Sequence, residues 1–226
     1  MKQACFDNII LCGSNSAYSK NTGKFIDNFS HIVRHNMLLP SALNGQKKSH
    51  LQIVNCHVWR NLHNLDKEAF IANYKYLDLP LEVVSGLYEL FNDKREIFAT
   101  FVNNNTTEMK NLLSSIGSDL NLNREIRCGL ALIPILAAEN IRPILFGYTI
   151  QNQDIFNHAY DRNPSCENHG IQIGHNCDEE IKCIIDLHNA ELIDASLCCL
   201  HISPENWPIK ITNQGLTLFN LYNEYN

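Results

Sequence analysis

Short apolar runs alternate along the chain with segments whose apolar residues recur at helical spacing. The strand-like runs are residues 8–12, 32–33, 51–55 and 142–148. The segments with helical features are residues 25–29 (a short helix or turn), 66–76, 82–101, 124–140 and 178–189. Strands of this length alternating with helices predict an α/β fold with a mainly parallel sheet flanked by helices. Because Pro134 lies within residues 124–140, that helix is expected to be kinked or to start late.

Residues 170–200 place a histidine between a strand and a helix. A short β-type run ends at Gly174, His175 follows, and three acidic residues then open the helix, where the helix dipole favours negative charge. Residues 192–200 resume a strand-like run. A histidine at this place in an open α/β sheet can present chemistry to a ligand. A helix cap or an ordinary surface position is the alternative interpretation.

Polar residues follow three of the predicted strands. Gly13 ends the first strand and opens a polar turn, Arg34 and Asn36 stand at the end of the second, and Asn55 ends the third. Because the carboxyl ends of parallel strands meet at one edge of a sheet, this pattern predicts a ligand crevice there. The turn lacks the second and third glycines of the dinucleotide fingerprint, so a polar turn without a ligand is the alternative.

Three segments are less regular. Residues 59–123 predict a helical insertion that serves as a lid or binds an acceptor, or else a helical flank on the sheet. Within them, the polar run 103–107 predicts a break and a helix cap. The polar residues 149–172 predict a long lid loop, and residues 202–226 show no clear element.

Length and charge narrow the class of protein. A chain of 226 residues with 45% hydrophobic residues suits a single globular domain spanning residues 1–226. Its net charge of −6, without a dense Lys/Arg stripe, argues against a general nucleic-acid binder. No run approaches the roughly 20 apolar residues that span a bilayer. The first residues fit a core strand better than a signal peptide.

Cysteine usage indicates the compartment. The nine cysteines are odd in number and scattered, and several stand in apolar runs, namely Cys12, Cys183, Cys198 and Cys199. This distribution is unlike a secreted disulfide framework. We therefore expect them to be mostly reduced, buried and structural in a cytoplasmic protein.

Two stretches carry motif-like residues near the predicted strand ends. Residues 9–36 contain a G-S-N turn after a strand, then G-x-x-I-D and V-x-R-x-N; the matching residues are Gly23, Ile26, Asp27, Val33, Arg34 and Asn36. Residues 128–148 contain Gly129 and a strand ending in Gly147 and Tyr148. These stretches resemble the large and small sialylmotifs of the animal-type sialyltransferases, glycosyltransferase family 29.

Two further motifs follow in the order of that family. His158-Ala159-Tyr160-Asp161 resembles its H-Y-Y-D motif. His175 and Glu180, followed by Leu187-His188, resemble its very small motif. The compact bacterial sialyltransferases of family 42 give an overlapping resemblance, through residues 13–16, 34–36, 55, 128–129 and 173–176. The chain departs from both patterns at Gly13-Ser14-Asn15, which replaces Gly-Asn, and at Cys128, which replaces a serine or threonine.

The resemblance implies a single Rossmann-like domain of a GT-A variant with a small lid or insertion. It implies inverting, metal-independent transfer of a nonulosonic acid from a CMP-sugar to a glycan hydroxyl, without a cofactor. His175 would be the general base, since a neutral imidazole suits that role near neutral pH. Tyr160, His158 and helix amides would stabilise the leaving phosphate. The implied substrate-binding residues are Gly13, Ser14, Asn15, Ser16, Asn36, Asn55, Cys128, Gly129, Gly147 and Tyr148.

The expected partners are a CMP-activated sugar donor and an oligosaccharide or glycolipid acceptor, and no nucleic acid. A glycolipid acceptor is compatible with a cytoplasmic protein attached peripherally at the inner membrane, although no basic amphipathic helix demands it. Assembly as a homo-oligomer is compatible with the sequence as well.

Three alternatives stay open. Cys166, His169, His175 and Cys177 could bind zinc, although their spacing lacks paired knuckles; a Cys166–Cys177 disulfide would need an oxidising compartment. The protein could be a nucleotide-binding Rossmann-like module without catalysis. The transferred sugar could be Kdo, legionaminic acid or pseudaminic acid in place of sialic acid.

Overall fold

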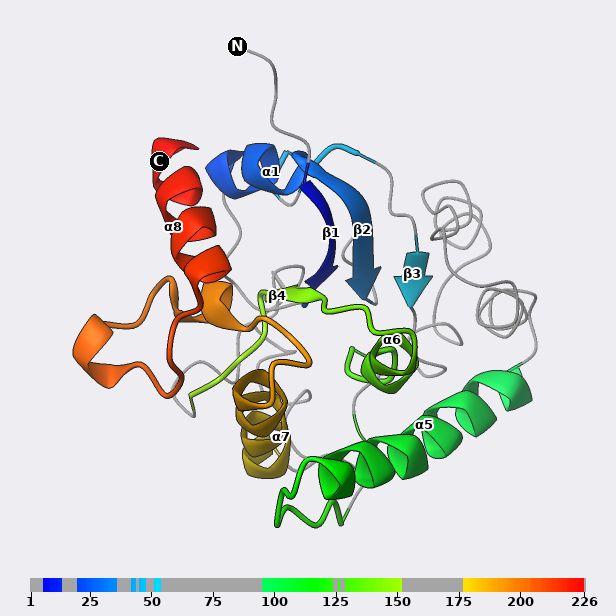
Figure 1. Ribbon diagram of the computed structural model, residues 1–226. Helices are drawn as coiled ribbons and strands as arrows, with labels where there is room; N and C mark the ends of the chain where they lie inside the picture. The colour runs from blue at the N-terminus through cyan, green and yellow to red at the C-terminus, as the bar shows by residue number, and fades with distance from the viewer. Residues whose placement is uncertain are drawn as a thin grey trace, which may run out of the picture.

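A parallel sheet forms the centre of the computed structural model. The structure describes residues 6–13, 20–35, 42–43, 45–47, 51–53, 95–123, 126, 129–151 and 177–225. Four strands form its sheet within these residues: β1 (Phe6–Cys12), β2 (Phe29–His35), β3 (Leu51–Ile53) and β4 (Ile144–Phe146). Their order is β3-β2-β1-β4, and every neighbouring pair is parallel (Figure 1). The coarse prediction of an α/β fold with a parallel sheet is therefore confirmed.

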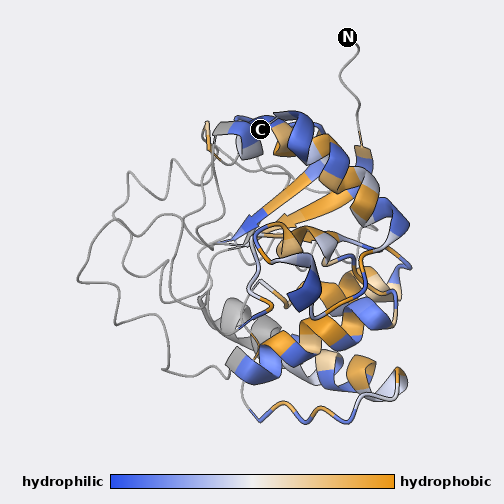
Figure 2. Cartoon of the chain, turned by 90° about the vertical axis from the view of Figure 1, so that its left-hand side faces the viewer, coloured by the Kyte–Doolittle hydropathy of each residue, from blue (hydrophilic) through white to orange (hydrophobic). Residues whose placement is uncertain are grey.

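Both faces of the sheet are buried, as is usual for a parallel sheet, and successive side chains of a strand pack on opposite faces. On β1, Ile9 and Leu11 belong to one hydrophobic cluster, whereas Ile10 and Cys12 belong to the other. Figure 2 shows the resulting band of hydrophobic residues along the strands, between helices of mixed hydropathy.

The helices form a layer on each face. Beside Ile10 and Cys12 lie α1 (Lys20–Ile26), the short 3₁₀ helix η3 (Ser196–Cys199) and α8 (Asn213–Tyr225). Beside Ile9 and Leu11 lie α5 (Arg95–Ser115), α6 (Ile133–Ala138) and α7 (Cys177–Asn189). A second 3₁₀ helix, η4 (Pro204–Asn206), connects η3 to α8. None of the helices that the structure describes is long and apolar enough to cross a membrane.

Several local predictions are confirmed. The four strand-like runs correspond to the four strands of the sheet, and the acidic residues after position 177 open α7. Pro134 lies in the first turn of α6, so this helix starts late rather than bending. Gly129 therefore lies in the turn before α6.

The predicted break at residues 103–107 is wrong, because α5 continues through it to Ser115. Two polar side chains of residues 103–107 are buried and form hydrogen bonds with backbone groups of the loop that follows α5. Asn105 donates from Nδ2 to the carbonyl of Ala131, and Thr106 Oγ1 accepts the N–H of Ile126 at 3.3 Å. Because Met109 and Leu113 of α5 belong to the core, this end of residues 59–123 is a helical flank on the sheet.

The predicted strand at residues 192–200 is also wrong. Asp194 makes one bridge to Ile144 of β4, and the carbonyl of Asp194 accepts the N–H of Leu145 at 2.8 Å. The Asp194 carboxylate then accepts the N–H of Ser196 at 2.9 Å and turns the chain into η3. The local turn chemistry of an aspartate thus ends the pairing after one residue.

Residues 202–226 contain an element that the sequence interpretation missed, namely α8. Thr212 caps it, since Thr212 Oγ1 accepts the N–H of Gly215 at 2.8 Å. Leu218 and Tyr222 then fall on its buried face. A capping threonine followed by apolar residues four apart was the signal available in the sequence.

The cysteines that the structure describes with their side chains fit the prediction of reduced, structural thiols. Cys12, Cys183 and Cys199 are buried and Cys198 is half-buried, and none of these four forms a disulfide. Burial raises the pKa of the Cys183 and Cys199 thiols to about 12. These thiols are therefore protonated and weakly reactive near neutral pH.

Candidate functional site

The ends of β1 and β4 lie against each other at the carboxyl edge of the sheet. The N–H of Gly13, just after β1, donates to the carbonyl of Phe146 at 2.7 Å. A Cβ at position 13 would lie 2.2 Å from the Gly147 carbonyl oxygen, so only glycine permits this approach. Gly147 has φ +71°, which turns the chain away from β4 in a conformation that favours glycine.

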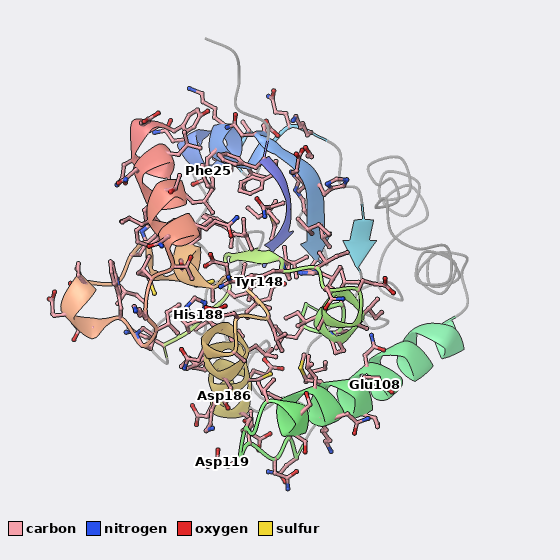
Figure 3. All side chains as sticks on the ribbon, viewed as in Figure 1. Phe25, Glu108, Asp119, Tyr148, Asp186 and His188 are labelled. Carbon is pink, nitrogen blue, oxygen red and sulfur yellow. The ribbon has the colours of Figure 1, made fainter. Side chains whose placement is uncertain are left out.

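Tyr148 connects this pair of strand ends to β2 and to the turn before α6. Its hydroxyl donates to the carbonyl of Gly129 at 2.8 Å and is hydrogen-bonded to His35 Nε2. A Cβ at position 129 would lie 3.3 Å from both the Tyr148 hydroxyl and His35 Cδ2. A Cβ at position 13 would lie 3.0 Å from the opposite edge of the same ring. Figure 3 shows Tyr148 beyond the end of β4, at the centre of the molecule.

Four predicted binding residues are thus brought together: Gly13, Gly129, Gly147 and Tyr148. Strands β2 and β3 are added on one side of β1 and β4 on the other, so the strand order reverses between β1 and β4. In open parallel sheets, ligands bind outside the carboxyl ends of the strands at such a reversal.

The other predicted site residues lie outside the described residues, so their positions stay predictions. They are Ser14, Asn15, Ser16, Asn36, Asn55, Cys128, His158, Tyr160 and His175. The zinc ligands proposed above also lack described side chains. Elsewhere, among the residues that the structure does describe, no group of three or more His, Cys, Asp or Glu side chains could hold a metal ion.

His35 belongs to the site although the sequence interpretation did not select it. It is the last residue of β2, its side chain is 3% exposed, and burial lowers its pKa to about 3. The imidazole is therefore neutral at neutral pH. The signal in the sequence is its place between Arg34 and Asn36, which are both predicted to stand at a strand end facing the crevice.

Arg34 and Asp27, two of the motif residues, have a structural role. Arg34 is fully buried, and its guanidinium donates to the carbonyls of Gly45 and Lys47 at 3.2 and 3.1 Å. The Asp27 carboxylate accepts the N–H groups of Gln46 and Lys47, each at 2.9 Å. Together these two side chains fix residues 45–47 beside the end of β2.

His188, Asp194 and Ser196 carry the side chains of a hydrolytic triad, but their contacts exclude that role. His188 Nδ1 accepts the N–H of Ala195 at 3.1 Å, and Nε2 then donates to the carbonyl of Lys210 at 2.8 Å. Both ring nitrogens are thus occupied by backbone groups, which leaves neither to take a proton from a serine. His188, which extends from α7 in Figure 3, instead joins that helix to the segments before η3 and α8.

We expect His188→Ala to lower the free energy of unfolding by about 2 kcal/mol, because it leaves a buried N–H and a carbonyl without partners. Urea denaturation would measure this. The matched control is His201→Ala, since His201 is exposed and its removal should change stability by less than about 0.5 kcal/mol. Equal losses of unfolding free energy in the two variants would contradict the role of His188 in holding α7 to the segments before η3 and α8.

A hollow lies between α7 and residues 201–206. It is lined in part by Ile181, Lys182, Ile185 and Asn206. The Lys182 ammonium is 2.7 Å from Asp119 Oδ1 and 3.0 Å from Asp186 Oδ2. An acidic ligand would have to displace these carboxylates, so the sheet edge is the better candidate for a nucleotide.

No protein-family model matches the chain, and no curated protein or solved structure is significantly similar to it.

Proposed function

We propose that the protein is a metal-independent, inverting glycosyltransferase that moves a nonulosonic acid from a CMP-sugar to a glycan hydroxyl. The observation that supports this best is the convergence of Gly13, Gly129, Gly147 and Tyr148 at one edge of the sheet. They come from three separate parts of the chain, and the family resemblance implies that each of them binds the donor. Their meeting is what a shared donor site requires.

The finer description of the fold is part of this proposal. The order β3-β2-β1-β4 is that of the first four strands of a Rossmann-like sheet, whose ligands bind at the reversal beside β1. A GT-A-variant domain with a lid or insertion fits this order. We assign the cytidylate to the edge formed by Gly13, Gly147 and Tyr148.

In the proposed reaction, the acceptor oxygen forms a bond to the anomeric carbon from one face while the bond to the cytidylate oxygen breaks on the other. His175 takes the proton of the acceptor hydroxyl, and the departing phosphate keeps the electron pair of the broken bond. His158 and Tyr160 would donate hydrogen bonds to that phosphate as its charge grows. No covalent intermediate is needed, and attack from the opposite face accounts for inversion.

A second candidate function is nucleotide binding without transfer. A protein of this kind would bind CMP but release no sugar. Transfer of Kdo, legionaminic or pseudaminic acid would use the same base and the same edge.

A screen against CMP, CMP-sialic acid and CMP-Kdo tests the proposal. A ligand at a hundred times its dissociation constant stabilises the folded state by about 2.7 kcal/mol, so binding should raise the melting temperature clearly. Release of CMP in the presence of a glycan acceptor would report transfer. Absence of both a thermal shift and CMP release with all three compounds would overturn the proposal. Binding of these compounds without release of CMP would support the second candidate function, nucleotide binding without transfer.

His175→Ala is expected to retain affinity for CMP and to lose transfer by on the order of a hundredfold or more, because it removes the base and not the nucleotide site. Transfer rates and CMP binding, measured on the same preparation, would show the separation.

The matched control is His169→Ala. A zinc site would make both variants lose metal and activity together, whereas a general base predicts loss in His175→Ala alone. Unchanged transfer in His175→Ala would contradict the base assignment.

A further inference from the structure

The contacts of Tyr148 determine which nitrogen of His35 carries the proton. The Tyr148 hydroxyl has a single proton, and it is donated to the carbonyl of Gly129. The Tyr148 oxygen must therefore accept the hydrogen bond that joins it to His35 Nε2. Since the buried imidazole is neutral, Nε2 holds its only N–H proton. Nδ1 is then left with a lone pair and no proton.

This lone pair has no hydrogen-bond partner among the residues that the structure describes. Nδ1 of His35 is buried and unsatisfied, whereas Nε2 on the same ring is held in place. A buried acceptor without a donor is costly, and such groups are rare in native structures unless something else satisfies them. His35 lies at the carboxyl end of β2, within the group formed by Tyr148, Gly129 and the end of β1.

We infer that His35 Nδ1 accepts a hydrogen bond from an N–H or O–H group of the bound nucleotide. This inference rests on the proposed function. It adds His35 to the binding site as a residue that recognises the hydrogen-bond donor groups of the ligand. Because Nδ1 is buried, the donor must belong to a part of the ligand that itself becomes enclosed at the sheet edge.

The chemistry limits which part of a nucleotide His35 can bind. A neutral imidazole with a bare lone pair has nothing to offer a phosphate oxygen, which accepts hydrogen bonds only. A cytidine nucleotide carries two kinds of donor, the amino group of the base and the hydroxyls of the ribose. Either would satisfy Nδ1, and comparison of nucleotides distinguishes them.

Two substitutions of His35 distinguish the roles of its two ring nitrogens. In His35→Gln, the longer amide can keep a donor near the position of Nε2 and maintain the bond to Tyr148, but it removes the acceptor at Nδ1. In His35→Asn, the shorter amide can keep an acceptor near Nδ1 but loses the bond to Tyr148. Stability should therefore fall mainly in His35→Asn, and nucleotide affinity mainly in His35→Gln.

Calorimetric titration with CMP, UMP and dCMP provides the test. We expect His35→Gln to bind CMP about tenfold more weakly than the wild type, the size of one lost hydrogen bond. If the base amino group is the donor, the preference of the wild type for CMP over UMP should disappear in this variant. If the ribose 2′-hydroxyl is the donor, the preference for CMP over dCMP should disappear instead.

Equal CMP affinity in His35→Gln and the wild type would overturn this inference alone, and would mean that a buried water satisfies Nδ1. Absence of binding by the wild type to all three nucleotides would overturn the proposed function with it. Nitrogen spectra of histidine-labelled wild-type protein keep the test independent of the variants' folding. The Nδ1 resonance of His35 should be that of an unprotonated nitrogen and should shift when CMP is added; an unmoved resonance at saturating CMP would contradict the inference.

Discussion

Gly13→Ala is expected to lower the free energy of unfolding by about 3 kcal/mol or more and to abolish binding of CMP. The new methyl carbon would lie 2.2 Å from the carbonyl oxygen of Gly147 and 2.8 Å from its carbonyl carbon. Both are backbone atoms, so no side-chain rotation can relieve the clash. The ends of β1 and β4 would have to separate, which is a severe case of overpacking. Urea denaturation and thermal shift with CMP would measure the two effects.

Gly117→Ala is the matched control, since it adds the same methyl group at a glycine that has nothing within 4 Å of the new carbon. Gly117 has φ +74°, so alanine there should cost about 1–2 kcal/mol through backbone conformation alone. The rise in melting temperature that CMP causes should be the same in Gly117→Ala as in the wild type. A Gly13→Ala protein as stable as Gly117→Ala, with intact CMP binding, would show that the two strand ends need not touch.

Arg34→Ala should lower the free energy of unfolding by about 4 kcal/mol. The substitution empties the volume of a fully buried side chain and leaves the carbonyls of Gly45 and Lys47 without their donors. Arg34→Lys should recover part of this loss, since it keeps a charge but cannot place two donors in a fixed fork. Urea denaturation would rank the wild type, Arg34→Lys and Arg34→Ala by their free energy of unfolding.

Lys24→Ala controls for loss of a positive charge, because Lys24 is exposed at the end of α1. It should change stability by less than about 0.5 kcal/mol. If Arg34→Ala fell within that range, the guanidinium would not be what holds residues 45–47.

Part of the site could be predicted because parallel strands obey a simple geometric rule. An apolar run followed by glycine, as at Gly13 and Gly147, indicates a strand and its end, and parallel strand ends share an edge. The sequence could not show that Tyr148 would direct its proton to Gly129. That bond depends on residues 19 positions apart, and the partner of His35 is 113 positions away.

Two of the errors have different physical causes, since a tertiary contact decided the structure at residues 103–107 and a local side-chain contact decided it at residues 192–200. Asn105 looked like a helix breaker, but its amide is used by the carbonyl of Ala131, and so α5 continues. Residues 192–200 have the composition of a strand, yet the Asp194 carboxylate turns the chain after one bridge. Neither of these hydrogen bonds leaves a periodic pattern in a sequence.

The pairing of α1 with α8 has a consequence for synthesis. Thr22 Oγ1 lies 3.1 Å from the Tyr222 hydroxyl, and these residues are 200 positions apart. At roughly 5–20 residues per second, a ribosome would add α8 roughly 10–40 s after α1. During that interval Phe25 would lack the aromatic ring of Tyr222 that packs on it, and Phe146, once added, would lack the same ring until α8 follows. The nascent chain would thus emerge with one side of its sheet uncovered, a state that chaperones recognise and that favours aggregation when they are scarce.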